Sequence, residues 1–141
     1  VGFPGETEED FTEILTFVRN VGFDNLGVFL YSDEEGTGAF NLDAKVTRRT
    51  ATRRRNQLMK EQAEISTAKL RRMVGKKVKV LLEGPSDESD LLLQGRMETQ
   101  APEIDGHVLI NDAGDRQPAA GDFYDVEITE SLEYDLIGKI L

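Results

Sequence analysis

The sequence predicts an α/β segment, then a helix, then an all-β domain. After residue 73, apolar residues change from helical spacing to short continuous runs, and one long stretch before that point lacks both Gly and Pro. The net charge also changes sign twice along the chain. We therefore divide the 141 residues into 1–44, 45–73 and 74–141.

Residues 1–44 are expected to form a βαβ unit. Val1–Phe3 has the character of a strand end, and Leu26–Tyr31 is a continuous apolar run of the kind found in buried parallel strands. Between them, Thr7 is placed to cap a helix with an acidic first turn, and Gly22 is placed to end it. A lone βαβ unit cannot bury both faces of its sheet, so we expect this segment to be a piece of a larger α/β domain.

Residues 45–73 are expected to form one helix, with an apolar residue every seventh position at Ala51, Leu58 and Ile65. This segment carries ten basic and two acidic residues, whereas the segments before and after it each have a net charge of −9. A solvated basic face and a connector that docks on an acidic surface are both consistent with this pattern. We favour docking on the acidic flanks of the same chain, because it needs no external partner.

Residues 74–141 are expected to form a five-stranded antiparallel barrel of the OB type, since five short apolar runs alternate with turn-rich stretches. The predicted strands are Val78–Leu82, Leu91–Met97, Val108–Ile110, Phe123–Thr129 and Leu136–Leu141. Such barrels usually bind single-stranded nucleic acid through a basic face. A net charge of −9 has the wrong sign for phosphates and favours a basic protein partner.

Several motifs resemble those of radical S-adenosylmethionine methylthiotransferases. Gly2–Thr7 resembles the fifth strand and following turn of their partial TIM-type barrel, and Tyr31–Ala39 resembles its sixth strand and closing loop. Residues 74–141 resemble their C-terminal TRAM domain. Within this family, Gln100–Gly106 and Tyr134–Gly138 resemble the RimO branch, which methylthiolates the β-carbon of an aspartate in ribosomal protein S-twelve.

The resemblance implies that the full-length protein is a transferase of a sulfur-containing group, with S-adenosylmethionine and two four-iron four-sulfur clusters as cofactors. The chain has no Cys to bind a cluster, so by itself it is expected to be inactive and to be a piece of a longer protein that begins before Val1. The implied partner is ribosomal protein S-twelve, with the ribosome as a further candidate. A cytoplasmic monomer is expected, and no apolar run approaches the 18 residues that a membrane span would need.

An alternative is an RNA-binding TRAM module of a methylthiotransferase that acts on adenosine in tRNA. In that case the cluster of five arginines between Arg48 and Arg55 would anchor the RNA. RNA is the less favoured partner, because the barrel is acidic.

The resemblance also implies that Gly2, Phe3, Glu6 and Leu30 bind the cofactor. The backbone of Gly2 and Phe3 would contact its adenosyl part, and the strand that contains Leu30 would meet the adenine edge. A tight strand-to-helix turn explains the sequence Pro4-Gly5-Glu6 almost as well.

Candidate partner-binding residues lie on the second predicted strand of the barrel and in the loop after it. Alternation places Arg96, Glu98 and Gln100 on one face, and Glu103 follows in the loop. An ordinary solvent-facing strand explains these residues equally well. No catalytic residue or metal ligand is predicted, and the single histidine, His107, is expected to be structural.

Overall fold

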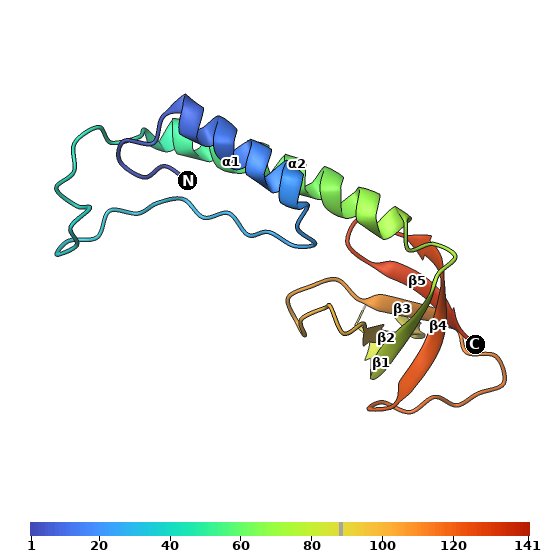
Figure 1. The fold of residues 1–141 in the computed structure, drawn as a ribbon. Helices are drawn as coiled ribbons and strands as arrows, with labels where there is room; N and C mark the ends of the chain where they lie inside the picture. Colours follow the sequence, from blue (N-terminus) through green and yellow to red (C-terminus); the bar gives the residue numbers. More distant parts are fainter. Residues whose placement is uncertain (88) are drawn as a thin grey trace. The chain divides into compact units, whose positions relative to one another are not determined.

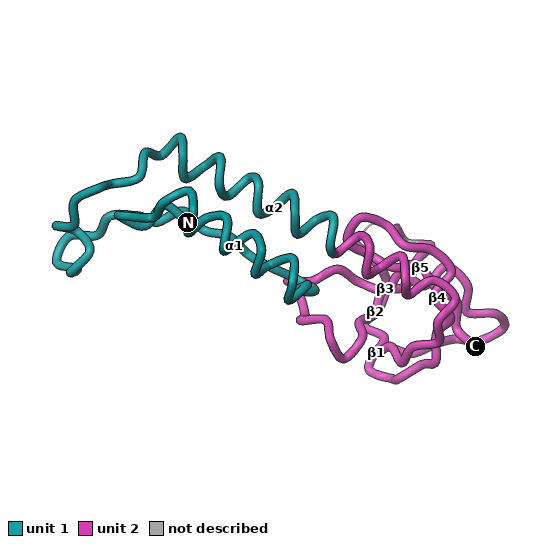
Figure 2. Tube along the Cα trace, turned by 45° about the horizontal axis from the view of Figure 1, so that its top comes forward, with its two compact units in different colours: residues 1–65 teal, residues 66–141 magenta. Residues whose placement is uncertain are grey.

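The computed structural model describes residues 1–87 and 89–141, and the chain divides into the compact units Val1–Ile65 and Ser66–Leu141. Figure 2 shows these two units in different colours. Helix α2 (Arg48–Arg71) crosses the boundary and therefore contributes to both units (Figure 1). In the part of the chain that the structure describes, neither helix is both long and apolar enough to span a bilayer.

Helix α1 (Glu8–Val21) begins and ends at the predicted residues. The hydroxyl of Thr7 accepts a hydrogen bond from the Asp10 N–H (3.1 Å), and the Asp10 carboxylate accepts one from the Thr7 N–H (2.8 Å). These reciprocal bonds form a capping box. At the other end, Gly22 adopts a left-handed conformation (φ 60°), and its N–H donates to the carbonyl of Val18.

In the first unit, α1 and the N-terminal part of α2 lie side by side and run in the same direction (Figure 1). Ion pairs join the two helices at both ends, from Arg54 to Glu8 and from Arg19 to Glu61. An apolar cluster fills the space between them; its buried members are Phe11, Leu15, Val18 and Leu58. The basic helix therefore docks on acidic residues of the same chain, as expected.

The two strands predicted in residues 1–44 do not form as strands. The amino group of Val1 donates to the carbonyl of Phe29, and the N–H of Tyr31 donates to the carbonyl of Val1, both at 2.9 Å. This is the bonding pattern of parallel strands. Gly2 then has a φ of 89°, which turns the chain out of the extended conformation. The predicted strand pair is thus reduced to a parallel contact at one residue.

In the second unit, five strands close a barrel in the order β1-β2-β3-β5-β4, with β4 pairing back to β1 (Figure 1). The strands are β1 (Lys77–Ser86), β2 (Ser89–Arg96), β3 (Val108–Asp112), β4 (Phe123–Ser131) and β5 (Leu136–Ile140). The buried core comprises Val80, Leu82, Val108, Ile110, Val126, Ile128 and Leu136. Alternate residues of the strands point into this core, as expected for a barrel.

The prediction that this barrel is entirely antiparallel is wrong for one pair, because β3 and β5 are parallel. The reason is topological. Strand direction reverses at every antiparallel step around a ring, and an odd number of reversals cannot return to the starting direction. A closed barrel of five strands must therefore contain at least one parallel pair.

Strand β1 also continues past its predicted end at Leu82. The pairing with β2 shifts register between Leu82 and Gly84, and again between Pro85 and Ser86. Gly84 adopts a φ of 137°, which a residue with a side chain rarely adopts. These irregularities let the strand pass through a Gly-Pro pair that normally ends a strand.

Barrel closure brings the backbone at Gly138 close to β4. An ideal Cβ at this position would lie 2.5 Å from Cγ1 of Val126 and 2.8 Å from the carbonyl oxygen of Glu127. We predict that Gly138→Ala lowers the free energy of unfolding of the barrel by at least about 2 kcal/mol, measured by urea denaturation. Gly38→Ala, in the first unit, is the control for the loss of a glycine itself, since nothing lies within 4 Å of a Cβ at that position. Equal stability of the two variants would contradict this prediction.

Candidate functional site

Arg54 of α2 carries a charge that is buried in the first unit, with only 2% of the residue exposed. Its Nη1 donates to the Glu6 carboxylate (2.5 Å) and to the Glu6 carbonyl (3.1 Å), and its Nη2 donates to the Glu8 carboxylate (2.7 Å). The Phe11 ring centroid lies 5.5 Å from its Cζ. These contacts join α2 to the turn at Glu6 and to the first turn of α1.

Glu6 links Arg54 to the backbone of Gly2 through hydrogen bonds to its two carboxylate oxygens. While one carboxylate oxygen of Glu6 accepts from Arg54, the other accepts from the N–H of Gly2 at 3.0 Å. The N–H of Glu6 also donates to the carbonyl of Phe3. The carboxylate predicted to bind the cofactor is therefore engaged inside the protein, where it fixes the conformation of the turn.

A hollow of about 90 Å³ lies beside this turn. Its lining includes two of the predicted cofactor residues, Gly2 and Leu30. The other lining residues are Tyr31, Asp33, Lys45, Val46, Arg48 and Ala51. Binding pockets for drug-sized ligands usually measure about 300–1,000 Å³, so this hollow accommodates only part of such a ligand.

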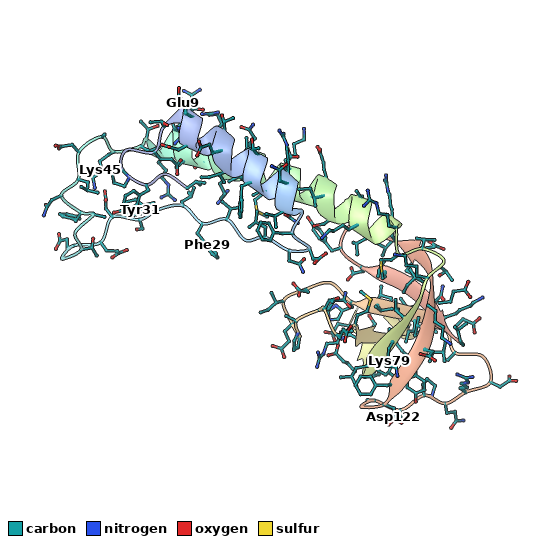
Figure 3. The ribbon with its side chains drawn as sticks, viewed as in Figure 1. Glu9, Phe29, Tyr31, Lys45, Lys79 and Asp122 are labelled. Atoms are coloured by element: carbon teal, nitrogen blue, oxygen red, sulfur yellow. The ribbon has the colours of Figure 1, made fainter. Side chains whose placement is uncertain are left out.

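Sequence reasoning did not identify the polar residues of this hollow. The Nζ of Lys45 donates to the Asp33 carboxylate (2.5 Å) and to the carbonyl of Phe40 (2.9 Å). Figure 3 shows Tyr31 and Lys45 in the extended part of the first unit, with Phe29 pointing away from the helices. Asp33 and Lys45 are twelve residues apart in an irregular segment, so no periodic pattern relates them.

Leu30 lies opposite Val1 in the parallel contact, between Phe29 and Tyr31, and Phe3 follows two residues after Val1. The Phe3 ring packs edge-on against Tyr31, with 5.2 Å between the ring centroids. Within the described ranges 1–87 and 89–141, no hydrogen bond engages the backbone N–H or carbonyl of Leu30. Parallel pairing uses alternate residues of a strand, so the polar backbone of Leu30 faces the opposite edge. This edge presents one backbone donor and one backbone acceptor for further hydrogen bonds.

The residues present do not fit an iron–sulfur cluster. The sequence has no Cys, which is the usual ligand of such clusters. Across the residues that the structure describes, no group of three His, Asp or Glu side chains gathers as a metal site.

In the barrel, the predicted partner-binding residues do not share one strand face. Strand β2 ends at Arg96, whose Nε donates to the carboxylate of Glu83 at 2.8 Å. Because alternation stops there, Glu98 lies exposed in the following loop instead of on a strand. Glu103 lies exposed in the same loop, where it was expected.

Gln100 is the clearest departure from this expectation, since only 9% of the residue is exposed. Its side-chain oxygen accepts from the N–H of Met97 (2.8 Å), and its side-chain nitrogen donates to the carbonyl of Gly106 (2.6 Å). Gln100 therefore braces the loop from inside. Its side chain is turned into the loop and is buried.

Residues 74–141, which include the barrel, match the TRAM domain family. Over its whole length, the chain is also 51% identical to proteins named "Ribosomal protein uS12 methylthiotransferase RimO" from Solibacter usitatus, Koribacter versatilis and Thermotoga maritima. It covers 30%, 28% and 31% of their lengths, respectively. The resemblance to the RimO branch is thus confirmed, and the chain spans about 30% of the curated relatives that it matches.

Removal of the buried guanidinium would leave Glu6 without its cationic partner. We predict that Arg54→Met lowers the free energy of unfolding of the first unit by about 3 kcal/mol, measured by urea denaturation. Arg53→Met is the matched control, because Arg53 is exposed and makes a single ion pair with Glu8. The control should cost less than about 1 kcal/mol. Similar losses in the two variants would show that burial does not distinguish these arginines.

Hydrogen bonds lower several carboxyl pKa values in the first unit. Bonds from Arg54 and then Arg53 hold the pKa of Glu8 below its ordinary value of 4.5. A hydrogen bond from the backbone N–H of Thr7 lowers the pKa of Asp10. Hydrogen bonds from Lys45 and Arg19 lower the pKa values of Asp33 and Glu61, respectively.

Because folding lowers these pKa values, the resulting stabilisation is present above the ordinary values and is lost as the pH falls through the lowered ones. We predict that the urea midpoint of the first unit decreases between about pH 5 and pH 3. Glu8→Gln should make this decrease shallower. A midpoint that rises or stays constant over this range would contradict the prediction.

Proposed function

We propose that this chain is the C-terminal part of a radical S-adenosylmethionine enzyme that methylthiolates the β-carbon of an aspartate in ribosomal protein uS12. The observation that carries the proposal is an identity of about 50% over the whole chain to proteins named for this activity. The chain spans about 30% of those proteins. The cysteines that bind the two four-iron four-sulfur clusters would lie in the part of the enzyme outside this chain.

In this proposal, the turn at Gly2 and the free backbone edge at Leu30 bind the adenosyl part of S-adenosylmethionine. When bound, the cofactor supplies the radical that removes a hydrogen atom from the substrate. This chain contributes by holding the backbone of the cofactor turn in a fixed conformation. Arg54 holds Glu6, and Glu6 holds the Gly2 backbone in place beside the hollow. Phe3 packs on Tyr31 and shields that side of the turn.

The TRAM domain would recognise the protein substrate. Residues 74–141 carry six basic and fifteen acidic residues, so long-range attraction favours a basic protein. Exposed Glu98 and Glu103 would contribute to this attraction, with Arg96 at the edge of the same region. The ribosome would be the wider setting of the reaction, and the full-length enzyme would act as a monomer in the cytoplasm.

One observation favours a second candidate, the RNA-binding module of a tRNA methylthiotransferase. Arg53 and Arg54 pair with acidic residues of α1 and its preceding turn. By contrast, Arg48, Arg49 and Arg55 have no carboxylate partner among the residues that the structure describes. Three cations without a carboxylate partner near the start of α2, of which Arg55 donates to the side chain of Asn56, are compatible with phosphate binding.

Titration of the 141-residue chain with purified uS12 and, separately, with tRNA tests the two candidates. We predict binding to uS12 that weakens as salt rises, and no binding to tRNA at low salt. The triple variant Arg48→Ala, Arg49→Ala, Arg55→Ala should leave uS12 binding unchanged. Absence of uS12 binding at every salt concentration would overturn the proposal. Tight tRNA binding that this variant abolishes would establish the RNA candidate.

A further inference from the structure

Two segments far apart in the sequence meet at one place on the barrel. They are the loop after β2, residues 97–106, and the connection from β4 to β5 around Tyr134. A Cβ on Gly106 would lie 1.9 Å from the carbonyl oxygen of Tyr134, so only Gly allows this approach. The N–H of His107 donates to the Asp135 carboxylate (2.6 Å), and the N–H of Leu136 donates to the carbonyl of His107 (2.9 Å). The two segments therefore present a common surface.

The loop of residues 97–106 is also fixed internally. The N–H of Ala101 donates to the Asp105 carboxylate (2.7 Å), and the N–H of Asp105 donates to the carbonyl of Ala101 (3.2 Å). Gln100 ties both ends of the loop through Met97 and Gly106. The backbone that carries the exposed side chains of this loop is thus held in place before a partner arrives, which reduces the entropic cost of binding.

The two segments together expose three apolar or aromatic side chains. Ile104 is 84% exposed at the tip of the loop, and Leu132 and Tyr134 are 42% and 59% exposed in the β4–β5 connection. Exposed apolar residues that gather in one place, rimmed by polar residues, mark interaction sites.

The same two segments also carry three exposed carboxylates, those of Glu98, Glu103 and Glu133. Glu98 and Glu103 are exposed, and no cation of the described part of the chain forms an ion pair with either of them. Glu133 lies beside the Tyr134 hydroxyl, and their hydrogen bond raises the pKa of Tyr134. On the neighbouring strands, in contrast, Glu83 pairs with Arg96 and Glu127 pairs with Lys139. These two segments thus combine exposed apolar groups with carboxylates that form no ion pair in the described part of the chain.

We propose that these two segments form a docking surface for a basic protein segment in which an apolar side chain is flanked by Lys or Arg. This loop surface consists of Glu98, Glu103, Ile104, Leu132, Glu133 and Tyr134. The apolar side chain packs on Ile104 and Leu132, the flanking cations pair with the glutamates, and a guanidinium stacks on Tyr134. RNA would instead place phosphates against free carboxylates. That the segment belongs to uS12 rests on the proposed function, whereas the surface itself does not.

The test uses the 141-residue chain and two probes, purified uS12 and a synthetic peptide of repeated Lys-Leu-Arg. The double variant Glu103→Lys, Glu133→Lys reverses two charges of the loop surface. Asp115→Lys, Asp122→Lys makes the same change in net charge in the β3–β4 connection, where Figure 3 labels Asp122. For the apolar contact, Ile104→Ser is compared with Leu91→Ser, because Leu91 is 90% exposed on β2. Unchanged urea midpoints verify folding.

The loop-surface charge reversal should weaken binding of both probes by at least about tenfold, and its control by less than about threefold. Ile104→Ser should weaken binding by about fivefold, and Leu91→Ser should leave it unchanged. Equal effects in variant and control, or no binding of either probe, would overturn the proposal. Competition by single-stranded RNA for the bound peptide would also overturn it. If only the peptide binds and the charge reversal abolishes this binding, the docking surface is supported and the proposal that uS12 is the substrate is overturned.

Discussion

In the first unit, the guanidinium of Arg54 lies among the Glu6 carboxylate, the Glu6 carbonyl and the Glu8 carboxylate. A buried charge is costly unless it is paired, and here the partners are Glu6 in the turn before α1 and Glu8 at the start of α1. The second oxygen of Glu6 then holds the N–H of Gly2. One side chain of α2 therefore determines both how the helices pack and how the candidate cofactor turn is shaped.

The same helix takes part in both hydrophobic cores. Leu58 is buried in the first unit with the apolar face of α1, and Leu70 packs against the interior of the barrel. Each unit thus has its own core, and α2 is the continuous element between them. In the proposed enzyme, one unit would contribute a wall of the cofactor site, and the other would select the protein substrate.

The sequence was sufficient to predict both ends of α1, the five barrel strands and the docking of a basic helix on acidic residues. It did not distinguish Arg54 from its neighbour Arg53, because the seven-residue apolar repeat of α2 includes neither position. Ala51, Arg54, Leu58 and Gln62 are all buried at spacings of three or four, so the buried stripe contains polar residues that a hydrophobic pattern omits.

The site residues of the barrel were harder to predict, because they depend on where a strand ends. Alternation of side chains along a strand predicts that Gln100 shares a face with Arg96, but β2 stops at Arg96. Gln100 instead points inward and hydrogen-bonds the carbonyl of Gly106. The proximity of Gly106 to Tyr134 depends on closure of the barrel, since the parallel pairing of β3 with β5 brings the two segments together. No local pattern reports such a contact.

A double-mutant cycle between Glu6→Gln and Arg54→Met tests the central claim most directly. The free energy of unfolding of the 141-residue chain would be measured for the wild type, both single variants and the double variant. If the buried pair is the interaction on which the first unit depends, the two substitutions should be coupled by at least about 2 kcal/mol, with the double variant losing much less than the sum of the single losses. Additive losses would contradict the account.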